Sequence, residues 1–238
     1  MKEAIIAVLV GVALALLIAC GVQQQQSNNV TPPVQGQNNP QANVWSNVDD
    51  SSSIVLDDNL LRINICLVFD CSGSMSGSKL STAKDVIKAF TLSVKPDMGL
   101  GLVVFDGGGI SERVPITVGE RKKFVATIDG LNAGGSTPLE SAMKIGYNAL
   151  QVQAKRQLGY GEYHLVVVTD GAADFGEDPQ KLVDKITSES PVIIHAIGFK
   201  IGTGHSLNQS GKTIYTDAQS PQDLAQGLQS VLAESEKL

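Results

Sequence analysis

The feature that most constrains the fold is a set of four short, nearly continuous apolar runs that are rich in β-branched residues. Such runs are typical of strands that are buried on both faces of a parallel sheet. Amphipathic helical patterns separate or follow them. The sequence therefore predicts an α/β fold, with a doubly wound, mostly parallel central sheet and helices on both faces. The runs are 61–70, 98–106, 163–170 and 191–199, and the main helical patterns are 79–93, 139–152 and the segment from Ser220 and Pro221 onward.

One further strand should run the other way. Residues 113–119 follow the second apolar run after only a glycine-rich turn. A connection that short cannot carry a crossover, so this segment is expected to pair antiparallel, at an edge of the sheet.

The N-terminal residues 1–19 indicate a signal peptide or a membrane anchor. The apolar stretch from 4 to 19 is shorter than the roughly 20 residues of a spanning helix, which favours a cleaved signal peptide. The sequence LIAC, which ends at Cys20, resembles the bacterial lipoprotein lipobox, and that resemblance implies a mature chain that begins at a lipidated Cys20. The alternative is an uncleaved anchor with an incidental cysteine. Both interpretations predict a membrane-anchored, extracytoplasmic protein, at a bacterial cell surface or in a periplasm.

Residues 20–59 are rich in Gln, Asn, Ser and Pro, and a chain of this composition buries too little apolar surface to fold. We therefore expect a disordered stalk over 20–59 and a folded domain over 60–238. Trp45, the single tryptophan, lies in the stalk, where a residue without contacts is favoured over one docked on the domain.

Charge and cysteine content exclude several classes. The net charge is −6 and no Lys/Arg block occurs, so nothing indicates a nucleic-acid surface. Cys66 and Cys71 lie along one extended segment and its exit, about 16 Å apart, which is too far for a disulfide. Both are expected to be unpaired thiols.

Two of the predicted strands end in aspartate, Asp70 and Asp170. In open α/β sheets the ligand site lies at the carboxyl ends of the strands, where the strand order reverses, so these carboxylates should meet there. With no lysine or arginine nearby they repel each other, and a divalent cation is the ordinary remedy. The hydroxyls of Ser72 and Ser74 leave the same turn as Asp70. Oxygen ligands of this kind indicate Mg²⁺, Mn²⁺ or Ca²⁺, and not zinc.

The sequence DCSGS, which covers Asp70 to Ser74, resembles the D-x-S-x-S signature of the von Willebrand factor type A domain. GGSTPL at 134–139 and VVVTDG at 166–171 resemble two further segments of that family in the same order, and the likeness extends over residues 60–236. It implies a metal-ion-dependent adhesion site in which Ser72, Ser74 and Thr137 ligate Mg²⁺ or Mn²⁺, while Asp70 and Asp170 hold its waters. It also implies that the ion binds an Asp or Glu of a partner protein, and that the protein is not an enzyme.

Plainer interpretations exist for each of these residues. Thr137 precedes Pro138 and Glu140 in a pattern that also predicts a helix cap. The serines could be ordinary loop residues and the two aspartates helix N-caps. Asp174, Glu177 and Asp178 form an acidic rim near Asp170 that could tune the field of the site, and Asp178, which precedes Pro179, could cap the next helix.

Two other functions stay open. GSMSGSK at 73–79 is close to the phosphate loop of a nucleotide hydrolase, but its glycine spacing is one short, Ser78 precedes Lys79, and Leu80 replaces the Mg²⁺-binding hydroxyl. The other alternative is a scaffold of the same fold in which the cation is purely structural.

Overall fold

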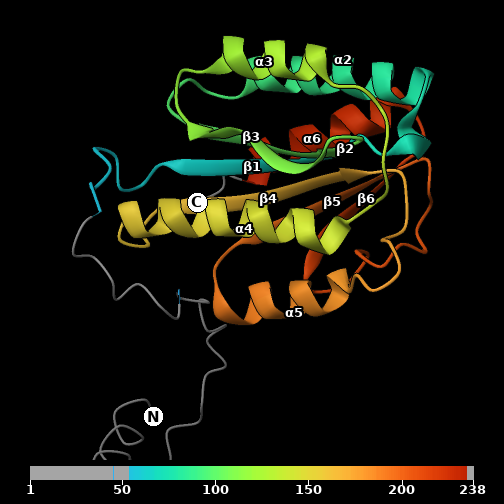
Figure 1. Cartoon of the computed structure of the whole chain (residues 1–238). Coiled ribbons are helices and arrows are strands. Elements are labelled where there is room, and N and C mark those ends of the chain that lie inside the picture. The colour runs from blue at the N-terminus through green and yellow to red at the C-terminus, as the bar shows by residue number, and fades with distance from the viewer. Residues whose placement is uncertain (1–44, 46–53, 235–238) are drawn as a thin grey trace, which may run out of the picture. The chain divides into compact units, whose positions relative to one another are not determined.

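The structure is a computed structural model of the chain, and it describes Trp45 and residues 54–234. Over these residues, six strands form one sheet in the order β3-β2-β1-β4-β5-β6 (Figure 1). All neighbouring pairs are parallel except β2 and β3, which are antiparallel. The predicted α/β fold and its antiparallel edge strand are confirmed. The strands are β1 (Ile63–Asp70), β2 (Gly99–Asp106), β3 (Gly109–Thr117), β4 (Glu162–Thr169), β5 (Ile193–Phe199) and β6 (Thr213–Ala218).

Helices cover both faces of this sheet (Figure 1). On one face lie α2 (Ser78–Ser93), α3 (Arg121–Gly130) and α6 (Pro221–Glu234), and on the other lie α4 (Leu139–Arg156) and α5 (Pro179–Glu189). Alternate residues of β1 serve the two cores: Leu67 packs on the α2 side, whereas Cys66 and Val68 pack on the α4 side. Because every strand of the sheet's centre is buried on both faces, its sequence is apolar at almost every position.

Helix α4 approaches the sheet through Gly146. A Cβ at this position would lie 2.8 Å from Leu165 Cδ1 and 3.1 Å from Val68 Cγ2. The missing side chain therefore sets how closely α4 can pack over β1 and β4, and α4 begins directly after the loop that carries Thr137.

Two helix starts carry side-chain caps, as expected for Asp178. The Asp178 carboxylate accepts a hydrogen bond from Lys181 N at the start of α5, and Ser220 Oγ accepts one from Asp223 N at the start of α6. Pro179 and Pro221 occupy the first helical positions, where a missing N–H costs nothing.

Both cysteines among the described residues, Cys66 and Cys71, are buried and unpaired, as expected. Burial raises the pKa of both thiols above the ordinary value, which disfavours the reactive thiolate.

Trp45 does not behave as a contact-free stalk residue, and the structure corrects that interpretation. Trp45 is only 9% exposed. Its ring stacks on Tyr147 at 5.9 Å between ring centroids and meets Tyr163 edge-on at 5.3 Å. Tyr147 lies on α4 and Tyr163 on β4, so the tryptophan is packed on the domain. The aromatic partners are far from Trp45 in sequence, which is why the polar composition around it gave no sign of this contact.

No helix within the described part of the chain has both the length and the apolar character needed to cross a membrane. The predicted signal peptide or anchor, Cys20 and most of the predicted stalk lie outside the described residues.

Candidate metal centre

Three loops meet at the carboxyl end of the sheet's centre. β1 and β4 are parallel neighbours, and the chain moves outward from β1 to β2 and β3 before it returns to β4 on the other side. The strand order therefore reverses between β1 and β4, which is where an open α/β sheet forms its binding crevice. Asp70 ends β1, Asp170 follows β4, and Thr137 lies on the loop before α4.

Asp70 is fully buried, and both of its oxygens are engaged. Oδ1 accepts a hydrogen bond from Ser72 N at 2.8 Å, and Oδ2 accepts one from Thr169 Oγ1 at 2.6 Å. Burial raises the pKa of Asp70 above its ordinary value, and the nearby negative charge of Asp170 acts in the same direction. The hydrogen bonds from Ser72 and Thr169 lower the pKa of Asp70 and so oppose both effects. Thr169 fixes the orientation of this carboxylate, a role that the sequence analysis did not assign.

The two predicted serines lie together and reach the second aspartate. Ser72 Oγ and Ser74 Oγ are 2.9 Å apart, and Ser74 Oγ donates to Asp170 Oδ1 at 2.6 Å. The turn Gly73–Met75 is a short 3₁₀-helix that begins directly after Ser72 and contains Ser74. The serines are therefore part of one polar cluster with both carboxylates, and not isolated loop residues.

Thr137 faces the same cluster. A Cβ built on Gly171 would lie 3.6 Å from Thr137 Oγ1 and 3.8 Å from Ser74 Oγ, so both hydroxyls border the same small space. Helix α4 has Pro138 as its N-cap, without a side-chain capping bond, which argues against the cap interpretation of Thr137. No described residue makes a hydrogen bond with the Thr137 hydroxyl, which leaves its lone pairs for a ligand.

The loop after β1 (residues 71–77) and the loop before α4 (residues 131–138), here called the threonine loop because it carries Thr137, are joined by backbone hydrogen bonds. Gly73 N donates to Gly135 O at 3.1 Å, and Gly134 N donates to Cys71 O at 2.9 Å. Gly135 has φ +79°, and a Cβ there would lie 2.7 Å from Asp106 O. Only glycine fits this position, and the close approach holds the threonine loop against the end of β2.

The acidic residues after Asp170 hold loops in place. Asp174 Oδ1 accepts from Thr137 N at 3.0 Å, and Asp174 N donates to Thr137 O at 3.0 Å. Glu177 accepts from both the backbone N and the hydroxyl of Ser141 in the first turn of α4. These contacts position Thr137, a role that the sequence alone does not reveal.

His205 contacts the same part of the site from another loop. Its Nε2 donates a hydrogen bond to Gly171 O at 2.9 Å, and the sequence gives no sign of this contact.

The expectation that no lysine or arginine lies near the paired carboxylates is wrong. Lys79 Nζ is 2.5 Å from Asp170 Oδ2. The lysine follows the serines on the first turn of α2, and helical winding returns its long side chain to the site. The sequence distance between residues 79 and 170 concealed this pair.

The residues present fit a divalent cation with oxygen ligands. Three hydroxyls and two carboxylates converge from three loops. The described residues contain no metal site of the other common kind, a cluster of three or more His, Cys, Asp or Glu side chains. Hard cations such as Mg²⁺ and Mn²⁺ prefer such oxygen donors. Ser72, Ser74 and Thr137 are the side chains that would hold the ion, with Asp70 and Asp170 behind them.

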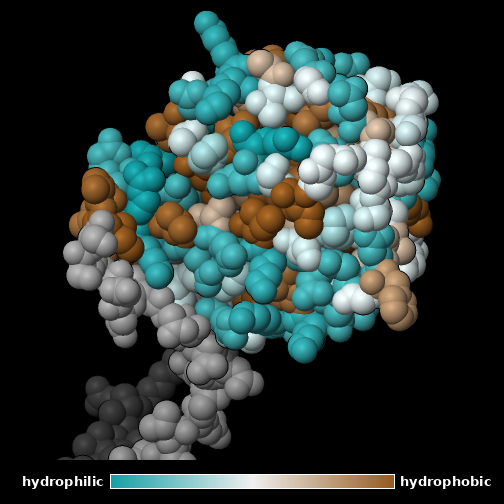
Figure 2. Space-filling model, in the orientation of Figure 1, coloured by the Kyte–Doolittle hydropathy of each residue, from teal (hydrophilic) through white to brown (hydrophobic). Residues whose placement is uncertain are grey.

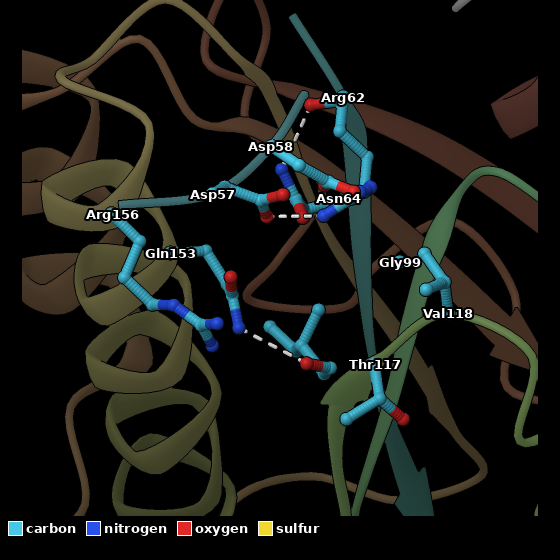
Figure 3. Close-up of a pocket in the computed structure, with 10 residues that line it drawn as sticks. Asp57, Asp58, Arg62, Asn64, Gly99, Thr117, Val118, Gln153 and Arg156 are labelled. Atoms are coloured by element: carbon cyan, nitrogen blue, oxygen red, sulfur yellow. Dashed lines mark hydrogen bonds and ion pairs between the residues drawn. The ribbon is translucent and has the colours of Figure 1, made fainter. Parts of the chain in front are cut away.

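A second polar cavity lies at the opposite end of β1, with a volume of about 260 Å³ (Figure 3). Arg62, one of its two lining arginines, is already paired with Asp57 and Asp58. Gln153 donates to Ile116 O across the cavity. On the face shown in Figure 2, hydrophobic residues occur in small groups among hydrophilic ones, so the described residues visible there form no broad apolar surface. The converging hydroxyls and carboxylates make the loop site the stronger candidate.

Comparisons with known proteins agree with this fold. The sequence matches the von Willebrand factor type A domain over residues 64–231. An uncharacterized protein of Synechocystis sp. is 28% identical over 148 residues, which cover 60% of this chain and 33% of that protein. Inter-alpha-trypsin inhibitor heavy chain H3 of Bos taurus is 28% identical over 160 residues, which cover 61% of this chain and 17% of that protein. The match thus spans a third or less of each relative's length.

Solved structures show the same fold. Proximal thread matrix protein 1 from the mussel byssus, with a zinc-occupied MIDAS motif, has a TM-score of 0.59 at 21% identity and covers 76% of this chain and 48% of its own. The vWF domain of the type V pili tip protein Mfa5 from Porphyromonas gingivalis has a TM-score of 0.56 at 13% identity, and the match covers 74% of this chain and 95% of that domain's chain. At these identities the likeness establishes the α/β arrangement.

Proposed function

The chain belongs to the von Willebrand factor type A domain family, and from that premise we propose that it is a membrane-tethered, extracytoplasmic module that binds an acidic group of a partner protein through one Mg²⁺ or Mn²⁺ ion, without catalysis. The observation that carries the proposal is the convergence of Ser72, Ser74 and Thr137 with two aspartates at the point where the strand order reverses. The pilus-tip and byssus proteins with this fold support an adhesive role by analogy.

The charges of the donor groups explain why such a site would select an acidic partner. Hydroxyl ligands are neutral, so a bound ion keeps much of its positive charge and offers a coordination position to a carboxylate. Asp70 is already engaged by Ser72 N and Thr169 Oγ1, which holds it in an orienting role beside the ion.

The rim of the site adds an apolar contact. Phe175 is fully exposed, and it follows Asp174, which is hydrogen-bonded to the threonine loop. A large exposed aromatic on a fixed loop is typical of an interface anchor. We therefore expect the partner to present an apolar patch beside its acidic residue.

The tether is inferred from the chain's N-terminal sequence, in which Cys20 follows an apolar stretch. Labelled palmitate should be incorporated into the wild-type chain and not into Cys20→Ala when both are expressed in bacteria. Equal incorporation by the two chains would contradict a lipid on Cys20.

A nucleotide hydrolase is the weaker candidate. The lysine that would contact phosphates, Lys79, is paired with Asp170, and Asp70 places a second carboxylate at the same point. ATP turnover by the purified chain that is lost in Lys79→Ala would nevertheless favour the hydrolase.

The decisive experiment compares wild type with Thr137→Ala. Calorimetric titration of the purified chain with Mn²⁺ and Mg²⁺ should show uptake by wild type and a loss of at least tenfold in affinity for Thr137→Ala. Thr127→Ala is a matched control, because the Thr127 hydroxyl bonds only within its own helix, to Lys123 O. No uptake by wild type would overturn the proposal.

The same variants separate an adhesion site from a structural cation. In a pull-down from envelope extract, an adhesion site requires that a partner is captured with Mg²⁺ and is lost with EDTA or with Thr137→Ala. Equal capture in every lane favours the scaffold.

A further inference from the structure

Lys79 occupies an unusual position for a cation. It stands in the first turn of α2, where the partial positive charge of the helix N-terminus disfavours an ammonium, and that turn contains no acidic residue. Its Nζ nevertheless lies 2.5 Å from the buried carboxylate of Asp170, while its own side chain is 32% exposed. The contact with Asp170 offsets the unfavourable helix position.

Asp170 divides its two oxygens between the serine cluster and this lysine. Oδ1 accepts from Ser74 Oγ and Oδ2 accepts from Lys79 Nζ. The two contacts use different oxygens, so the lysine can remain on Asp170 while the hydroxyls turn toward a cation. The geometry therefore allows Lys79 to stay in the site when an ion binds.

We propose that Lys79 is a fixed counter-charge that weakens the hold of this site on its divalent ion and strengthens the attraction of the loaded site for a carboxylate. The inference rests on the proposed function. Counted by themselves, Asp70, Asp170 and the Lys79 ammonium carry a single negative charge, and a divalent ion converts this into a single positive charge. Without Lys79 the two aspartates and the ion would together be neutral.

The charge also explains how Asp70 and Asp170 lie together before an ion binds. Two carboxylates at one crevice repel each other, and a neighbouring ammonium reduces that repulsion. The hydroxyl groups of the site carry no net charge, so they cannot reduce this repulsion in the same way. The site can therefore be assembled in advance, and binding of the ion need not order the three loops.

Metal affinity tests the first half of the proposal. We expect Lys79→Met to bind Mn²⁺ roughly three- to tenfold more tightly than wild type in calorimetric titration of the purified full-length chain, as Coulomb's law gives for a unit charge beside a divalent ion in a hydrated site at physiological salt. Lys79→Arg keeps the charge and should retain the wild-type affinity.

Lys88→Met is the matched control, because it removes the same charge from the same helix at a surface ion pair with Asp85 and Asp129. Its Mn²⁺ affinity should equal that of wild type. Equal or weaker Mn²⁺ binding by Lys79→Met, in a chain that folds, overturns the proposal.

Acetate tests the second half. With Mn²⁺ bound, the paramagnetic relaxation of acetate methyl protons reports how tightly a carboxylate binds at the ion. We expect acetate to bind Lys79→Met about two- to fivefold more weakly than wild type, and Lys88→Met to match wild type. Acetate affinity that is unchanged in Lys79→Met also overturns the proposal.

The outcomes separate this proposal from the proposed function. If wild type takes up no Mn²⁺, the adhesion site itself is refuted; if it takes up Mn²⁺ and Lys79→Met does not differ from it, only the counter-charge is refuted. Should Lys79→Met fail to fold, Lys79→Gln replaces it and keeps a hydrogen-bond donor for Asp170.

Discussion

Acidification should destabilise the native domain through His195 in β5. This imidazole is 1% exposed, its Nε2 lies 3.1 Å from His164 Nδ1, and His164 Nε2 in turn lies 2.5 Å from Glu162 Oε1. If His164 donates Nε2–H to Glu162, its Nδ1 accepts from His195 Nε2–H, and His195 Nδ1 remains a buried acceptor without a partner among the described residues. A second proton on His195 would therefore be a buried, unpaired charge.

The size of the effect follows from linkage. Burial lowers the pKa of His195 from 6.5 to about 3, and the nearby His164 acts in the same direction. As pH falls below 6.5 the unfolded chain binds a proton at this position and the native state does not, so stability is lost at about 1.4 kcal/mol per pH unit. Between pH 6.5 and 4.5 the loss is about 2 kcal/mol.

Urea unfolding of wild type and His195→Gln at pH 7.5, 6.5, 5.5 and 4.5 measures this loss. Glutamine keeps a donor for His164 and cannot titrate. We therefore expect the amount by which His195→Gln is less stable than wild type, measured as the free energy of unfolding, to shrink by about 2 kcal/mol between pH 6.5 and 4.5. In the folded wild type, the NMR signals of the His195 ring should stay those of the neutral form at pH 4.5. Stability curves that remain parallel across this range would refute the reasoning.

Three further predictions concern packing and the metal loops. Gly146→Ala should lower the free energy of unfolding by about 1–3 kcal/mol in urea titration, because its methyl group overlaps Leu165, and an unchanged value would contradict the close helix–sheet approach. Trp45→Ala should cost about 2–3 kcal/mol in the same assay, and the fluorescence of the single tryptophan should shift to the red when wild type unfolds; a solvent-exposed spectrum in the native state would contradict the docking. Asp174→Ala should weaken Mn²⁺ binding about tenfold by loosening Thr137, with surface Asp129→Ala as control, and equal affinities would exclude a positioning role.

The strong elements of the fold were predictable because their patterns are local. The strand predicted at 163–170 is Glu162–Thr169, and the helix predicted at 79–93 is Ser78–Ser93. Helix α3 was missed because only Phe124 and Ile128 are buried along it, and two apolar residues one helical turn apart are too few to indicate a helix. Strand β6 was missed because it is a half-exposed edge strand with a single fully buried residue, Ala218.

The candidate site was predictable for a different reason. Asp70, Ser72 and Ser74 share one turn, and Asp170 ends a strand that the apolar pattern identifies. Thr169, Asp174 and Lys79 act through contacts between segments 37 to 99 positions apart in sequence, for which a single sequence carries no spacing signal.

The chain enters the domain at one end of β1 and the loops of the site lie at the other end. At the entry, Arg62 is clamped by Asp57 and Asp58, and Asp57 N donates to Arg156 O. If the chain is tethered at its N-terminus and binds a ligand at these loops, as proposed, a pull between the two would run lengthwise along β1, which is bonded on both sides by β2 and β4. Under such shear the ladder bonds bear the load together and cannot open one at a time, which makes the geometry mechanically resistant.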